Sequence, residues 1–148
     1  MELNSQQLKY MLGSVEDFCG VFSYDQLPRN FGYPAAFIFN TDRHDQSGQH
    51  WMSAYFNKDG FGQYQCSLGI APYGALYDFL SQHSYKTEYN KSTLQNPFNT
   101  ACGYYCVLHI LMANKGYELN DFVTLFDKED LAKNDRLVLR LVAEYLTH

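Results

Sequence analysis

The sequence lacks the features that mark several classes of protein. It has no run of basic residues and a formal net charge of −5, so nothing in it suggests a surface for nucleic acid. No apolar run approaches the length of a membrane span, and the first residues are typical of an amphipathic helix instead of a signal peptide. Internal repeats, low-complexity tracts and linkers are also missing. The 148 residues therefore predict one domain, residues 1–148, that is large enough to bury a core.

The four cysteines do not have the spacing of a disulfide framework. Cys102 and Cys106 are one helical turn apart, which does not suit a bridge between them, a CxxC redox motif or a zinc knuckle. We therefore expect reduced thiols in an intracellular protein. Aromatic residues, in contrast, are plentiful, and 13 Tyr and 11 Phe indicate a well-packed fold.

The hydrophobic pattern of the first half predicts a helix, a loop and a small sheet. Asn4 or Ser5 can cap a helix that runs to Leu12, and a loop-rich stretch follows as far as Pro34. Short apolar or alternating runs then indicate strands, and an Asp-Gly pair between two of them indicates a hairpin. The predicted strands form an antiparallel meander and are Ala35–Phe39, His50–Phe56 and Phe61–Cys66, with a surface loop at 40–49.

The second half is mainly helical. A helical pattern begins at Pro72, and Tyr85–Asn90 is predicted to be an edge strand. Three more helices are predicted at Ala101–Asn114, Leu119–Phe126 and about Lys128–Leu146. The first of these three is apolar on nearly all sides, which is typical of a central helix. The predicted fold class is α+β, with a small, mostly antiparallel sheet flanked by helices and a central apolar helix that starts at Cys102.

Cys102 stands where a polar, turn-forming loop becomes this apolar helix. With Asn99 or Thr100 as the N-cap, Cys102 would lie in the first helical turn, where free N–H groups and the helix dipole stabilise a thiolate. Gly103 would leave room beside the sulfur for an approaching backbone. A nucleophilic cysteine needs a site of this kind. Taken alone, however, a free cysteine is more often a small buried apolar residue.

A cysteine nucleophile needs a base, and the chain has five histidines. His50 opens a predicted strand after a loop of turn-forming residues, so its ring can face a cleft from a rigid element. The other four are His44, His83, His109 and His148. His109 shares the predicted helix of Cys102 but is about two turns away, too far to touch it. We select His50, although a lone histidine at such a position is more often a surface residue.

Two segments together resemble the adenovirus-type cysteine proteases, that is adenain and its relatives in virus-like mobile elements. They are GQHWMSAYF, which contains His50, and LQNPFNTACGYYC, which contains Cys102. The chain matches the family signature at Gly48, His50, Trp51, Gln95, Asn99, Ala101, Cys102, Gly103 and Cys106. The resemblance covers roughly residues 3–111. More distantly it extends to the ubiquitin-like-protein proteases, which share the chain order His, acid, Gln, Cys.

The resemblance implies a thiol endopeptidase that processes viral or virus-like-element precursor proteins, with small or glycine residues near the cut. Cys102 would attack the scissile carbonyl, while His50 would take the thiol proton and later protonate the leaving amine. Gln95 and the Cys102 backbone N–H would hold the oxyanion, and Trp51 would pack beside the histidine. The implied location is the host-cell cytoplasm or nucleus, and the virion. A deubiquitinase or SUMO-type protease is the alternative within the same class.

We expect no bound cofactor and no metal. Relatives are activated by a short peptide that adds to the sheet, and by DNA. The cysteine that tethers this peptide in adenain has no obvious counterpart here, and the charge balance does not support nucleic acid. The expected partner is therefore a polypeptide substrate, with an activating peptide as a second candidate and no membrane.

The family pattern breaks at one position. Relatives carry Asp or Glu after the second strand of the hairpin, whereas this chain has Cys66, followed by the expected Ser67 and Gly69. A thiol supplies no charge at neutral pH unless its pKa is lowered. Three interpretations stay open: a working pair of Cys102 and His50, a pseudoprotease that binds peptides or serves virion assembly, and a zinc site that uses both cysteines and the histidine. The nearest acids, Asp59 and Asp78, are out of register and are not selected.

Overall fold

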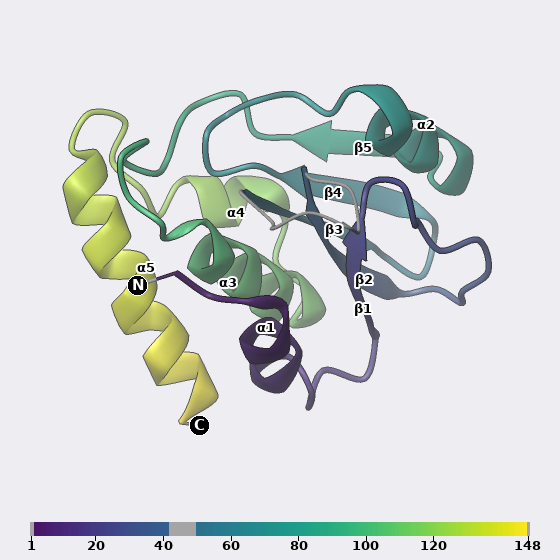
Figure 1. The fold of residues 1–148 in the computed structure, drawn as a ribbon, viewed down its shortest axis with the longest axis horizontal. Helices are drawn as coiled ribbons and strands as arrows, with labels where there is room; N and C mark the ends of the chain where they lie inside the picture. Colours follow the sequence, from purple (N-terminus) through teal and green to yellow (C-terminus); the bar gives the residue numbers. More distant parts are fainter. Residues whose placement is uncertain (1, 42–49, 148) are drawn as a thin grey trace.

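A five-stranded sheet forms the centre of the computed structural model, which describes residues 2–41 and 50–147 (Figure 1). The strands lie side by side in the order β1-β2-β3-β4-β5. Their bounds are β1 Phe18–Ser23, β2 Ala35–Asn40, β3 Trp51–Phe56, β4 Phe61–Gln65 and β5 Lys86–Tyr89. The helices are α1 Ser5–Met11, α2 Gly74–His83, α3 Cys102–Asn114, α4 Leu119–Val123 and α5 Leu131–Leu146. The α+β class, with helices that flank a sheet, is confirmed.

The sheet is antiparallel only in its centre. β2, β3 and β4 form the predicted meander, whereas β1 joins β2 and β5 joins β4 in parallel. The prediction of a mostly antiparallel sheet therefore holds for the three central strands and not for the two edge strands, which pair in parallel. β1 lies in the stretch predicted to be a loop, because Gly20, at φ +139°, and a register shift after Phe18 interrupt the alternation that identifies a strand.

Helices cover both faces of the sheet. On one face α3 packs on β3 and lies between the sheet and α5, and α1 and α4 complete this layer (Figure 1). On the other face α2 packs through Phe79 on the rings of Phe37, Phe39 and Phe56. As predicted, α3 is the central helix, since all its residues from 102 to 113 are buried. In the described part of the chain, no helix is both long and apolar enough to cross a membrane.

A chain of buried polar groups joins α3 to β3 and β4. His109 lies with Nδ1 2.8 Å from the Ser53 hydroxyl and Nε2 2.9 Å from Gln63 Oε1. Because the Gln63 oxygen can only accept, Nε2 carries the hydrogen and Nδ1 accepts from Ser53. Ser53 Oγ accepts in turn from Gln65 Nε2 at 3.0 Å. Burial lowers the pKa of His109 to about 3, so this histidine is a neutral core group at pH 7.

Two buried side chains attach α5 to the loop that precedes α3. Asn134 Nδ2 donates to the carbonyl oxygens of Leu94 at 2.9 Å and Asp127 at 2.7 Å. The Tyr105 hydroxyl donates to Asp135 Oδ1 at 2.7 Å and also lies 3.3 Å from the Leu94 carbonyl oxygen. The C-terminal helix therefore helps to hold the loop that leads into Cys102 and α3.

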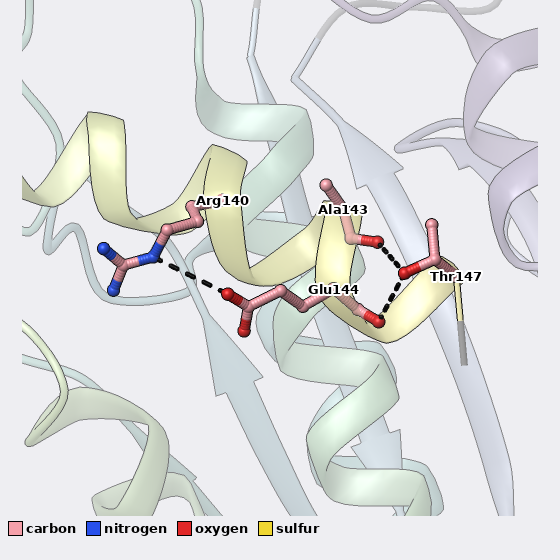
Figure 2. Close-up of polar contacts among 4 residues, drawn as sticks. All are labelled: Arg140, Ala143, Glu144 and Thr147. Atoms are coloured by element: carbon pink, nitrogen blue, oxygen red, sulfur yellow. Dashed lines mark hydrogen bonds and ion pairs between the residues drawn. The ribbon is translucent and has the colours of Figure 1, made fainter.

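The outer face of α5 carries surface contacts. Arg140 Nε lies 3.8 Å from Glu144 Oε1, and the Thr147 hydroxyl donates to the carbonyl oxygens of Ala143 and Glu144 (Figure 2). An exposed ion pair of this spacing contributes only about 0.3–0.5 kcal/mol, and Arg before Glu is the less favourable order. The attachment of α5 thus depends on its buried face.

We predict that Asn134→Ala lowers the free energy of unfolding by about 1–3 kcal/mol, because buried backbone groups lose their hydrogen-bond partner. Urea unfolding of the variant and the wild type measures this difference. Asn114→Ala, at the exposed end of α3, is the matched control and should change the stability by no more than about 0.5 kcal/mol. Equal losses in the two variants would contradict the role given to Asn134.

We also predict that His109 makes the fold sensitive to acid. Its pKa is about 3 in the folded protein and about 6.5 in the unfolded chain. Between these values the unfolded chain binds one proton more, so this residue lowers stability by about 1.4 kcal/mol for each pH unit that the pH falls. Urea unfolding between pH 7 and pH 4.5 should therefore give a smaller pH slope for His109→Gln than for the wild type. An identical slope in the two proteins would show that His109 is protonated in the fold.

Candidate active site

Cys102 is the first residue of α3, as the prediction of a first-turn position requires. The predicted cap is wrong, because the N-cap is Ala101 and no side chain caps the helix. Asn99 bonds instead to the backbone N–H of Thr100 through Oδ1, at 2.6 Å. The first N–H groups of α3 are therefore not taken up by a capping side chain and are available to a thiol or a ligand.

The sulfur of Cys102 is buried among backbone donors. The N–H groups of Trp51, Gly103 and Cys102 itself each lower the pKa of this thiol, but burial raises it by more, and the Glu2 carboxylate adds to the rise. The helix start thus supplies the donors that the sequence predicts, whereas the net effect on the pKa is opposite to the expected one. The bond to Trp51 also puts the sulfur beside the peptide unit that joins His50 to Trp51.

His50 precedes β3 and contacts Cys66. The distance between His50 Nε2 and Cys66 Sγ is 3.3 Å, so the residue at the predicted acid position faces the second ring nitrogen. Burial lowers the pKa of His50 to about 4, and no charged neighbour offsets this effect. At neutral pH the imidazole is therefore uncharged. The exposed carboxyls of Asp59 and Asp78 have no part in this shift.

Cys66 is fixed by its backbone and surrounded by donors. Asn90 Oδ1 accepts from the Cys66 N–H at 3.0 Å, and Asn90 Nδ2 donates to the Cys66 carbonyl at 2.6 Å. Burial raises the pKa of the Cys66 thiol, while the backbone N–H groups of Ile70, Leu68 and Gly69 oppose that rise. Several backbone N–H groups that point at one side chain in a turn form a site suited to an anion. Here they surround a neutral thiol.

The turn after β4 runs beside the segment that leads to Gln95. The Ser67 carbonyl accepts from the N–H groups of Leu94 at 2.8 Å and Gln95 at 3.0 Å. Gly69, at φ +74°, has no space for a side chain, since a Cβ atom there would lie 2.8 Å from the carbonyl carbon of Ser92. The two segments are therefore packed backbone to backbone, which fixes the position of Gln95 relative to Cys66.

The side chain of Gln95 is buried and held at both ends. Its Oε1 accepts from the Ser67 hydroxyl at 2.5 Å, and its Nε2 donates to the carbonyl of Asn99 at 2.7 Å. Because Ser67 follows Cys66 directly, one turn links the amide of Gln95 to the residue that contacts His50. Cys102, His50, Cys66 and Gln95 thus lie in one neighbourhood.

Trp51 and Gly103 both pack against the N-terminal segment. The Trp51 indole is buried in the layer that contains α3, and Nε1 donates to the Leu3 carbonyl at 2.9 Å. A Cβ atom on Gly103 would lie 3.1 Å from Leu3 Cβ, so the space beside this glycine is filled by Leu3 and is not open to a substrate. Both residues therefore contact Leu3, which packs the N-terminal segment against the start of α3.

Of the remaining candidates, His83 lies apart from this neighbourhood and Cys106 lies close to it. His83 ends α2 and packs on the rings of Phe31 and Phe79. The Cys106 sulfur, one turn beyond Cys102, lies 3.7 Å from Gln65 Nε2, and burial together with the nearby thiols of Cys102 and Cys66 raises the pKa of Cys106. Three residues named from the sequence lie outside the described residues: His44, Gly48 and His148. Within residues 2–41 and 50–147, no group of three or more Cys, His, Asp or Glu side chains could hold a metal, so the zinc interpretation finds no support.

Sequence reasoning misses the residues that support the site. Asn90 and Asp135 each act on a segment far away in the sequence, and no local pattern marks such contacts. Ser67 is part of the family pattern, but its hydrogen bond to Gln95 joins positions 28 residues apart. In the sequence Asn90 is only the last residue of a predicted edge strand, and nothing there shows that its side chain is buried.

Comparison with solved structures identifies the fold. The crystal structure of the ASFV pS273R protease matches with a TM-score of 0.63 and 14% identity, over 90% of this chain and 63% of that one. The structure of its Se-Met form matches with a TM-score of 0.52 and 19% identity, over 76% of this chain and 44% of that one. This chain therefore spans less than two thirds of the length of the protease that it resembles.

Sequence comparison adds no relative, because neither a protein-family model nor a curated protein matches the chain. Identities of 14% and 19% establish the fold alone. Together with the five-stranded sheet and the central helix, they support one conclusion. The chain has the α+β fold of a viral protease.

Proposed function

We propose that the chain is a cysteine endopeptidase of the adenain type, which processes viral or virus-like-element precursor proteins in the host cell or the virion without a bound cofactor. The observation that carries the proposal is the 3.3 Å contact between His50 Nε2 and Cys66 Sγ. This contact occupies one ring nitrogen and leaves Nδ1 for the thiol of Cys102, whose sulfur lies beside the peptide unit that follows His50.

In the proposed reaction the thiol proton of Cys102 passes to Nδ1 of His50 as the sulfur attacks the scissile carbonyl. The oxyanion that forms accepts from the Cys102 backbone N–H and from Gln95 Nε2. That amide nitrogen has two hydrogens, of which one bonds to Asn99 and the other is the donor needed here. Each such donor contributes about 3 kcal/mol to transition-state stabilisation.

The second half of the proposed reaction uses the same groups. The imidazolium of His50 protonates the leaving amine, the C–N bond breaks, and a thioester remains on Cys102. Water, deprotonated by His50, then attacks the thioester and releases the acid product. The neutral thiol of Cys66 accepts from Nε2–H of His50 more weakly than a carboxylate would. We therefore expect a slower enzyme than one with an acid at position 66.

One observation favours a second candidate, a pseudoprotease that binds peptides without cutting them. The pKa of His50 is about 4 and burial raises the pKa of both nearby thiols, so an ion pair of thiolate and imidazolium is costly before substrate binds. A substrate that excludes water and supplies hydrogen bonds can lower this cost. The two candidates therefore differ in turnover and share the binding cleft.

We predict that a peptide vinyl sulfone with glycine residues before the reactive group labels Cys102 and that Cys102→Ala abolishes the labelling. The reason is that the nucleophile must react faster than an ordinary buried thiol. Mass spectrometry of the labelled protein identifies the modified residue. Cys19→Ala, which removes the exposed thiol of β1, is the control and should keep full labelling. Labelling that survives Cys102→Ala would overturn the proposal, and a preference for probes with a ubiquitin-like C-terminus would point to a modifier protease.

We further predict that Cys66→Asp raises kcat/KM by about 10- to 100-fold, because a carboxylate in contact with Nε2 stabilises the imidazolium of His50 and fixes its tautomer. Hydrolysis of a fluorogenic peptide measures the change. Cys19→Asp makes the same chemical change at an exposed position and should have no effect. Cys66→Asn, which keeps a hydrogen-bond acceptor without the charge, controls for the cost of a buried acid and should give a smaller gain. No gain in a folded Cys66→Asp protein would mean that the missing charge does not limit the reaction.

A further inference from the structure

A cavity of about 410 Å³ opens beside the contact between His50 and Cys66. Met52 and Tyr64 of the sheet and Leu76 of α2 are among the residues that line it. Its size is within the range of about 300–1,000 Å³ that is common for small-molecule sites. It therefore has room for a large side chain of a bound peptide.

The described residues that line this cavity are uncharged. They include no Asp, Glu, Lys or Arg, and the side chains of Met52, Tyr64, Ile70 and Leu76 give it an apolar surface. The imidazole of His50 is also neutral at pH 7, because its pKa is about 4. Burial of a charged group in such a place is costly. The chemistry of the walls therefore fits an aliphatic or aromatic ligand group and disfavours a charged one.

The cavity and Cys102 lie on opposite faces of the sheet. Met52 and Tyr64 belong to the layer between the sheet and α2, together with Cys66. Cys102 and Trp51 belong to the layer between the sheet and α3. His50, at the start of β3, lines the cavity and is joined to Trp51, whose N–H meets the sulfur. His50 therefore connects the cavity to the surroundings of the sulfur.

The direction of the substrate follows from the chemistry of the imidazole. The ring that takes the thiol proton must also reach the leaving amine, so the part of the substrate after the cut extends over the histidine. A cavity that His50 lines, on the opposite face of the sheet from the layer that contains Cys102, is next to this leaving part. The residues before the cut extend in the other direction and do not enter it.

We propose that the cavity binds an uncharged aliphatic or aromatic side chain from one of the first two substrate residues after the cut, and so determines specificity on the leaving-group side. This inference rests on the proposed protease function and adds the substrate class to it. Ile70 and Tyr73, 51% and 69% exposed, lie at the cavity where an incoming chain can contact them. The specificity is independent of the small residues expected before the cut.

A set of internally quenched peptides tests the inference. All of them have glycine before the cut, and they carry Leu, Phe, Gly or Glu at the first or the second residue after it. We expect kcat/KM to be at least about tenfold higher for Leu or Phe than for Gly at one of these positions, with Glu lowest. Ala75→Phe, an exposed lining position of α2, narrows the cavity and should reduce the Leu-to-Gly ratio to near one. Ala132→Phe, an exposed position of α5, is the matched control and should keep the ratio.

Binding measurements separate this inference from the proposed function. The same peptides are titrated into the Cys102→Ala protein and into Cys102→Ala with Ala75→Phe, by calorimetry. If the protein binds Leu or Phe peptides selectively and Ala75→Phe abolishes this selectivity, the inference about the cavity is supported. If the wild type then cuts no peptide, only the protease proposal fails. Equal affinity for Leu, Gly and Glu peptides, or a preference unchanged by Ala75→Phe in a protein with wild-type melting temperature, would overturn the inference.

Discussion

Burial without a balancing charge determines the chemistry of this site. The thiols of Cys102 and Cys66 and the imidazole of His50 are each removed from water, and in each the dominant effect on the pKa is desolvation. Backbone N–H groups oppose this effect at both sulfurs but do not overcome it. The candidate site is therefore a set of neutral groups, and in the proposed reaction charge develops together with the substrate. A cleft of this kind receives an apolar chain more easily than an ionic one.

The position of these groups does not depend on their charge. The Asn90 side chain bonds to the backbone N–H and carbonyl of Cys66. The Ser67 carbonyl accepts from the backbone N–H of Gln95, and the Ser67 hydroxyl donates to the side-chain oxygen of Gln95. Asn134 of α5 donates to the Leu94 carbonyl in the loop before α3. All of these are hydrogen bonds between neutral groups, which persist over a wide range of pH and salt. The frame can therefore keep its geometry although position 66 carries a thiol. The proposed reaction therefore has a fixed geometry at position 66 although no acid stands there.

The sequence predicts what local patterns encode and misses what distant contacts decide. The hydrophobic pattern identifies α3, and the Asp-Gly turn identifies the hairpin of β3 and β4, because both signals are local. β1 is missed since a glycine with positive φ interrupts a short edge strand. The side chain of Asn99 does not cap α3, because it bonds to the next backbone N–H. At the site, the order of His50, Gln95 and Cys102 is visible in the sequence, whereas the direction of their pKa shifts depends on burial, which only the folded chain defines.

The hydrogen bond from the Trp51 indole to the Leu3 carbonyl has a consequence for motion. Leu3 also fills the space beside Gly103, so the first residues of the chain rest against the helix turn that carries the sulfur. Displacement of Leu3 would therefore remove a neighbour from Trp51 and from the start of α3 in the same event. The order of the turn that carries the Cys102 sulfur thus depends on a residue that takes no part in the proposed chemistry.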